Sequence, residues 1–171
     1  MKPVINLDEI RPEPRPALFQ PPETAAERYG AMTGQVAPSL GLAKLGCNVT
    51  VVPPGKRAFP MHNHYVNDEL FLILEGSGEL RIADDTWPLR VGDVIGCPAG
   101  GTQTAHQIIN TGASDLRYLC ISTKLQPDIV EYPGSAKFAV MGERPATPDG
   151  KRGWFRFVGR EDQQIGYWEG E

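Results

Sequence analysis

The stretch from Gly55 to Gly76, GKRAFPMHNHYVNDELFLILEG, decides the fold. It contains His62 and His64, two of the three histidines of the chain, and Glu69 follows five residues after His64. Two side chains separated by one residue project to the same face of a β-strand, whereas a helix would need a spacing of three or four. The ring nitrogens of such a pair can bind one cation at about 2.0–2.2 Å. The stretch therefore predicts strands with a metal site on one face.

The composition of the whole chain favours an all-β fold. Its 171 residues are 40% hydrophobic and 22% charged, as in an ordinary soluble domain. The 19 Gly and 16 Pro interrupt the chain too often for long helices. A formal charge of -4 without a basic run argues against nucleic acid as a partner. No window approaches about 18 consecutive apolar residues and no signal core opens the chain, so we expect a cytoplasmic protein without a membrane partner.

Short strands are predicted at intervals that suit a sandwich or a closed barrel. Residues 45–51 alternate between apolar and polar, residues 70–74 are apolar throughout and are expected to be buried on both faces, and Pro88 suits an edge strand at 87–90. Further strands are expected at 79–83, 94–97, 106–110 and 116–123. We predict a Pro-rich arm at 1–41 with a short helical turn at 23–30, a barrel at 42–123, and an extension at 124–171 that adds one or two strands outside the barrel. The arm is expected to lie on the barrel or on a neighbouring subunit, which favours a homodimer.

The third histidine, His106, begins a later predicted strand and would add a fourth donor to the site. It belongs to a second block formed by Gly92, Pro98, Gly100, His106 and Asn110. This block and the first block, formed by Gly55, His62, His64, Glu69 and Gly76, resemble the two motifs of the cupin superfamily. The resemblance implies a double-stranded β-helix barrel, also called a jelly roll. It also implies that the metal ligands are His62, His64, Glu69 and His106.

Two features depart from a simple match. One extra residue lies between Gly55 and His62, and GTQTA makes the loop before His106 longer than in the family. Because His106 keeps its family spacing to Asn110, it remains the expected ligand. Asn110 is expected to form hydrogen bonds with the backbone in the turn before Gly112. Asp68 is an alternative carboxylate, but neighbours on a strand face opposite ways, and the resemblance favours Glu69.

The alternation of side chains between the two faces of a strand identifies candidate pocket residues. Phe71 and Ile73 share a face with Glu69, and Ile108 shares one with His106. Other candidates for the interior are Cys97, Gln103 and Tyr118, and candidates for holding an anion at the barrel mouth are Arg57 and Arg81. The three cysteines, Cys47, Cys97 and Cys120, form no CxxC pair and are expected to be reduced thiols.

Three imidazoles and one carboxylate with open positions suit one divalent transition metal per subunit, namely Zn, Mn, Fe, Ni or Co. The segments HYVNDELFLILEG and PDIVEYPGSAKF resemble small bacterial cupins described as sugar-phosphate isomerases. We therefore expect a small metalloenzyme that acts on a small polar metabolite. The alternatives are an Fe(II)-dependent dioxygenase and a non-catalytic sensor or storage protein for a small ligand. No Gly-rich phosphate loop and no base apart from the ligands stand out in the sequence.

Overall fold

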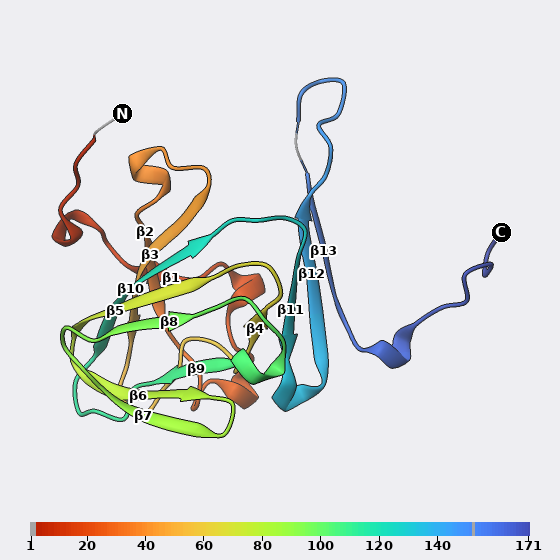
Figure 1. Cartoon of the computed structure of the whole chain (residues 1–171). Coiled ribbons are helices and arrows are strands. Elements are labelled where there is room, and N and C mark those ends of the chain that lie inside the picture. The colour runs from red at the N-terminus through yellow and green to blue at the C-terminus, as the bar shows by residue number, and fades with distance from the viewer. Residues whose placement is uncertain (1–2, 152) are drawn as a thin grey trace.

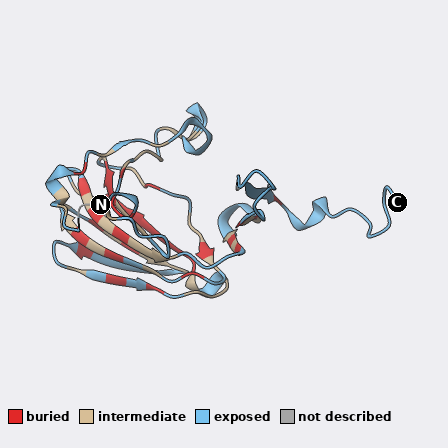
Figure 2. Cartoon of the chain, turned by 90° about the horizontal axis from the view of Figure 1, so that it is seen from above, coloured by how far each residue is buried: buried red, intermediate tan, exposed pale blue. Residues whose placement is uncertain are grey.

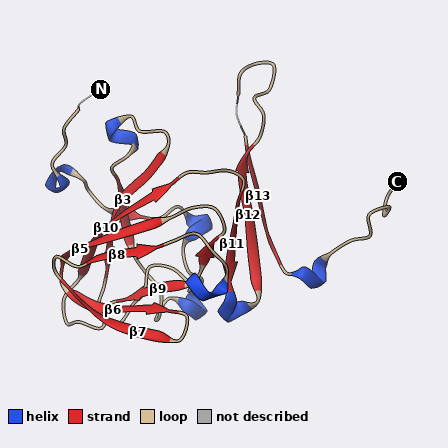
Figure 3. Cartoon of the chain, viewed as in Figure 1, coloured by secondary structure: helices blue, strands red, loops and turns tan. Residues whose placement is uncertain are grey.

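The computed structural model describes residues 3–151 and 153–171. The first two residues of the predicted arm and residue 152 of the predicted extension therefore lie outside the described residues. Within the described part of the chain, helix occurs only as 3-10 turns of three residues, and the named strands pair antiparallel (Figures 1 and 3). The predicted all-β class is confirmed. The turns are η1 (Leu7–Glu9), η2 (Ala17–Phe19), η3 (Glu23–Ala25), η4 (Pro38–Leu40), η5 (Thr102–Thr104), η6 (Pro133–Ser135) and η7 (Glu161–Gln163).

Two sheets form the walls of the barrel (Figure 1). The larger has the strand order β1 (Glu13–Pro14), β2 (Met32–Gln35), β3 (Leu45–Val52), β10 (Leu116–Thr123), β5 (Glu69–Glu75) and β8 (Val94–Cys97). The smaller has the order β7 (Asp85–Arg90), β6 (Ser77–Ile82) and β9 (His106–Ile109), so that Pro88 lies on an edge strand as predicted. Apolar side chains from both sheets meet in one buried core. The predicted jelly-roll barrel is confirmed.

Strand β5 shows how alternation sets the inner and outer faces. Phe71 and Ile73 point into the core and are 5% and 1% exposed, while Leu70 on the opposite face is 39% exposed. The prediction that residues 70–74 are buried on both faces is therefore wrong at Leu70. Among the described residues, the apolar cluster that the N-terminal arm forms on the outer face includes residues of β3 and β10 but none of β5.

The arm lies on the barrel of its own chain. Strand β1 pairs with β2, and β2 pairs with β3, so the arm widens the larger sheet. Ile10 and Val36 pack against Val49 and Val51 in a second buried cluster. The apolar residues that punctuate the Pro-rich segment are thus used to attach it to the sheet.

The C-terminal extension forms a separate sheet with the order β13 (Trp154–Gly159), β12 (Lys137–Glu143), β11 (Asp128–Tyr132) and β4 (Asn63–His64). The extension contributes three strands rather than the expected one or two, because the polar stretch before Gly153 is the loop of a β12–β13 hairpin. Val130 of β11 pairs with His64, which joins the extension to the barrel. Residues after β13 are exposed and run away from the barrel (Figure 2).

The Asn110 side chain stabilises the turn that follows β9 through hydrogen bonds. Its fully buried side chain donates hydrogen bonds to the carbonyls of Val52 and Ser114 and accepts one from the amide of Gly112. The turn role predicted for Asn110 is confirmed. Because β9 carries His106, this network also fixes the strand that presents that histidine.

We expect Gly76→Ala to destabilise the barrel more than Gly92→Ala. Both glycines have positive φ, +80° and +92°, so alanine is strained at either position by about 1–2 kcal/mol. A Cβ at Gly76 would also clash with the carbonyl oxygen of Asp115, whereas nothing lies within 4 Å at Gly92. Overpacking adds about 1–3 kcal/mol. Urea denaturation of both variants measures the difference, and equal losses of unfolding free energy would contradict this account.

Candidate metal centre

Three strands and the residue pairing just before β4 bring the four predicted ligands to one point inside the barrel. His64 lies in β4, Glu69 begins β5 and His106 begins β9. His62 precedes β4, and its backbone exchanges two hydrogen bonds with that of His106, with N···O distances of 3.2 and 2.8 Å. The longer loop before His106 folds into η5 and returns the chain to this position. His106 therefore reaches the site despite the insertion.

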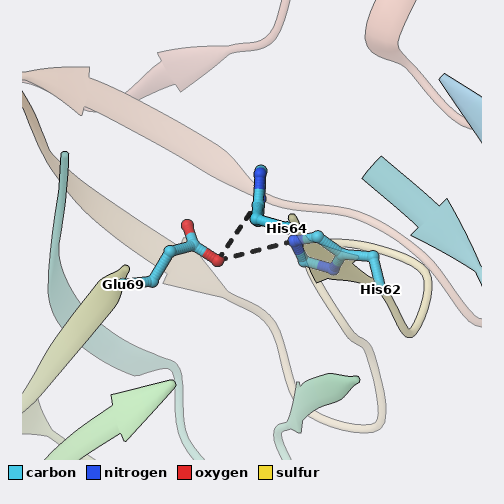
Figure 4. A group of neighbouring side chains, drawn as sticks. All are labelled: His62, His64 and Glu69. Atoms are coloured by element: carbon cyan, nitrogen blue, oxygen red, sulfur yellow. Dashed lines mark ion pairs between the residues drawn. The ribbon is translucent and has the colours of Figure 1, made fainter. Parts of the chain in front are cut away.

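The three imidazoles surround one oxygen of Glu69. The Nε2 atoms of His62 and His64 each lie 3.6 Å from Glu69 Oε2 (Figure 4). The Nε2 atom of His106 lies 3.0 Å from the same oxygen. Ligand atoms of His62, His64 and Glu69 all lie within 4.8 Å of one another. The Glu69 carboxylate, rather than the alternative Asp68, thus occupies the centre.

The opposite nitrogen of each ring is held by a hydrogen-bond acceptor. His62 Nδ1 lies 2.9 Å from the carbonyl oxygen of Pro60, and His106 Nδ1 lies 3.3 Å from that of Thr104. His64 Nδ1 lies 2.6 Å from Asp128 Oδ2. Acceptors at Nδ1 require the proton there, which leaves the lone pair of each neutral ring on Nε2. All three rings are therefore oriented as metal-binding histidines are, with an outer acceptor that fixes the tautomer.

The charges of the cluster are coupled. Burial alone would raise the pKa of Glu69, but hydrogen bonds from His106 and His62 and the charges of His62 and His64 hold that pKa well below its usual range. Burial alone would lower the pKa of His106, but its hydrogen bonds with Cys97 and Glu69 raise it to about 9. For His64, burial is likewise outweighed by Asp128 and Glu69, and its pKa is raised. Without a metal, a proton on His106 compensates the charge of the buried Glu69 carboxylate.

This donor set fits a divalent transition metal. Three imidazole nitrogens and one carboxylate oxygen are donors that Zn, Mn, Fe, Ni and Co all accept. The residues that would hold the ion are His62, His64, Glu69 and His106. Because the ligand atoms of His62, His64 and Glu69 already lie within 4.8 Å of one another, little rearrangement of the backbone is needed to bind a cation.

Most of the predicted pocket residues line the interior around the cluster. Phe71 and Ile73 are buried on β5. The centroid of the Phe71 ring lies 5.7 Å from the centroid of the His106 ring and 5.8 Å from that of the Tyr118 ring. The other predicted members of the same buried core are Cys97, Ile108 and Tyr118. Cys97 is paired with Glu69 across β8 and β5, which places its thiol beside the cluster.

The structure does not bring three of the predicted residues to the cluster. Gln103 lies on the exposed turn η5. Arg81 pairs with Gln107, one position away from the Ile82–His106 pair. Because neighbouring residues of a strand face opposite ways, the Arg81 side chain lies on the face of β6 opposite to that of Ile82. The Arg57 guanidinium lies over the ring of Tyr29, 5.8 Å from its centroid, on the arm.

Two residues near the site were not predicted from the sequence. Asp128 belongs to the extension, and the pairing of β11 with β4 brings it to His64. Tyr132, four residues further along β11, stacks on His62 with 6.2 Å between ring centroids. Tyr132 also lines a cleft of about 490 Å³ between the extension and η5. No local pattern marks either residue, because their role depends on the pairing of two distant strands.

A comparison with known families agrees with this geometry. Residues 48–122 match the cupin domain family, a segment that includes all four clustered residues. This central segment is a cupin domain. An uncharacterized protein of Methanocaldococcus jannaschii is 35% identical to the chain over 72 residues, which are 42% of this chain and 54% of that protein. The chain thus spans about half the length of this curated relative.

Solved structures share the fold over most of the chain. A sugar phosphate isomerase from a cupin superfamily, from Silicibacter pomeroyi, has a TM-score of 0.74 at 23% identity, with 94% of each chain covered. A predicted oxalate decarboxylase from Thermotoga maritima has a TM-score of 0.57 at 24% identity, with 71% of this chain and 99% of that chain covered. At these identities the likeness concerns the fold.

Among the described residues, no helix is long and apolar enough to cross a membrane.

We expect the unfolding free energy of the metal-free protein to fall as the pH rises from about 6.5 to about 9. The pKa of His106 is about 9 in the folded protein and near 6.5 in an unfolded chain, so the folded state holds an extra proton in this window. The stabilisation is fully present below pH 6.5 and is lost as the pH passes 9. Urea denaturation in the presence of a chelator measures this slope. A His106→Gln variant should show a shallower slope, and an unchanged slope would contradict the role of His106.

Proposed function

We propose that this cupin binds one divalent transition metal per subunit through His62, His64, Glu69 and His106. The observation that carries the proposal is the convergence of three Nε2 atoms on Glu69 Oε2 while each Nδ1 is held by an acceptor. A purely structural cluster would need no common orientation of three rings. Four protein donors leave coordination positions open for a small ligand.

We further propose that the protein is a metalloenzyme that moves a proton between neighbouring carbons of a small polar metabolite, as a sugar-phosphate isomerase does. The bound metal would supply a Lewis acid that polarises substrate oxygens. The rings and the carboxylate hold the ion, and Phe71, Ile73 and Ile108 keep the inner wall dry. The Silicibacter pomeroyi structure, which matches over 94% of this chain, supports this reaction class.

A second candidate is an Fe(II)-dependent dioxygenase. Buried apolar side chains beside the cluster favour it, because they would shield a reactive centre from water. A non-catalytic sensor or storage protein uses the same ligands without turnover. The homodimer stays a prediction in all three cases.

Metal loading distinguishes a real site from a chance cluster. We expect Glu69→Gln, and separately His62→Ala with His64→Ala, to abolish stoichiometric metal in protein purified without added metal, while circular dichroism still reports a folded barrel. Asp68→Asn is the matched control, since the Asp68 carboxylate is exposed and accepts a hydrogen bond from the amide of Ala99. Unchanged metal content in the Glu69 and histidine variants would refute the site.

The outer acceptor of His64 should matter for affinity. Asp128→Ala removes the acceptor at Nδ1 and frees the ring to rotate, and loss of such a partner weakens metal binding by about 10–100-fold. Competition with a chromophoric chelator measures the dissociation constant. An affinity within about twofold of the wild type would show that Asp128 does not position His64.

Activity assays separate the three candidate functions. The proposed isomerase should interconvert the aldose and ketose forms of a phosphorylated sugar. Exchange of the transferred proton with solvent monitors this reaction. Iron in the purified protein together with O₂ uptake would favour the dioxygenase instead. Tight binding of a co-purified ligand without turnover would favour the sensor.

A further inference from the structure

Arg15 is the residue of the N-terminal arm that reaches the neighbourhood of the metal centre. It lies between Pro14 and Pro16, whose rings restrict the backbone. Pro14 pairs with Met32 of β2 on one side, and η2 begins at Ala17 on the other. The arm therefore holds Arg15 at a fixed place on the barrel.

The Arg15 side chain is directed toward the segment that carries His62. Its Nη2 donates a hydrogen bond to the carbonyl oxygen of Ala58, at 2.5 Å. Its guanidinium carbon lies 4.5 Å from the centroid of the Phe59 ring. The centroids of the Phe59 and His62 rings are 6.1 Å apart. One aromatic ring thus separates the guanidinium from a candidate ligand.

The same guanidinium acts on the barrel interior. The pKa of Tyr118 is raised mainly by burial, and the positive charge of Arg15 opposes this rise. Tyr118 packs edge-on against Phe71, which contacts His106. The position of Arg15 near the cluster rests on its contact with Phe59, whose ring neighbours that of His62.

The charge of Arg15 has no acidic partner among the described residues. A guanidinium offers five donors, and the hydrogen bond described above uses one of them on a neutral carbonyl. Arg117, by comparison, pairs with Glu75 at 2.6 Å. Arg15 is also half-buried, and burial lowers its pKa. A partly desolvated cation with unused donors gains more from an incoming anion than an exposed arginine does.

We propose that Arg15 binds an anionic oxygen group of the substrate, a phosphate or a carboxylate, while the metal centre holds the reacting oxygens of the same molecule. The inference rests on the proposed function. It supplies the anion-binding group for which the sequence offered no phosphate loop. It also assigns to the arm the role that had been expected of Arg57 and Arg81, which the structure turns away from the cluster.

Phe59 suits the space between the two groups. Phe59 is 37% exposed, and its ring neighbours both the Arg15 guanidinium and the His62 ring, so its exposed part offers an apolar surface to the carbon skeleton of a bound metabolite. A small molecule with an anionic group at one end and hydroxyl or carbonyl oxygens at the other would contact all three.

Anion titrations of metal-loaded protein test the proposal. Inorganic phosphate and acetate serve as probes in isothermal calorimetry, and the two arms distinguish a phosphate site from a carboxylate site. We expect Arg15→Gln to weaken the tighter of the two anions by about 10-fold or more, and Arg15→Lys to weaken it less. Arg81→Gln is the matched control and should bind as the wild type does. Equal affinities in wild type and Arg15→Gln, or no binding of either anion to the wild type, would overturn the proposal.

A second measurement needs no variant. Phenylglyoxal modifies accessible arginines, and peptide mass spectrometry reports the rate at each one. Phosphate or acetate should slow modification of Arg15 severalfold while Arg81 serves as the internal reference, and unprotected Arg15 would overturn the proposal. Absence of bound metal would instead refute the proposed function, so the two failures are distinguishable.

Discussion

The Glu69 carboxylate is the constraint on which the arrangement of this protein depends. A buried carboxylate is costly unless positive charge or hydrogen-bond donors surround it. Here three imidazoles, two from the segment at β4 and one from β9, meet one of its oxygens. Each imidazole in turn needs an acceptor for its other nitrogen, and those acceptors come from Pro60, Thr104 and Asp128. The register of β4, β5, β9 and β11 must satisfy all of these contacts at once.

The segments outside the barrel serve the same centre. The extension supplies Asp128 to His64 through the pairing of β11 with β4. The arm supplies Arg15 beside Phe59 and closes the outer face of β3 and β10 with its apolar residues. The barrel core would thus present the metal ligands, while the arm and the extension would adapt the surroundings to a particular ligand. This division explains how one fold can host many reactions.

Much of the fold was predictable from the sequence because its signals are local. Alternation along 45–51 and the HxH pair depend only on strand geometry, and they correctly placed β3 and the face shared by His62 and His64. The residues that escaped prediction depend on tertiary pairing. Asp128 acts only because β11 lies beside β4, and Arg15 acts only because the arm folds back onto its own sheet. The same reason explains the exposure of Leu70, since an apolar run does not reveal where the arm ends.

Anomalous X-ray diffraction from crystals of the purified protein, recorded at the absorption edges of Mn, Fe, Co, Ni and Zn, tests the central claim most directly. We predict a single anomalous peak inside the barrel, about 2.0–2.3 Å from the Nε2 atoms of His62, His64 and His106 and from an oxygen of Glu69. A barrel without a peak after incubation with these metals, or a peak bound by other residues, would contradict the account.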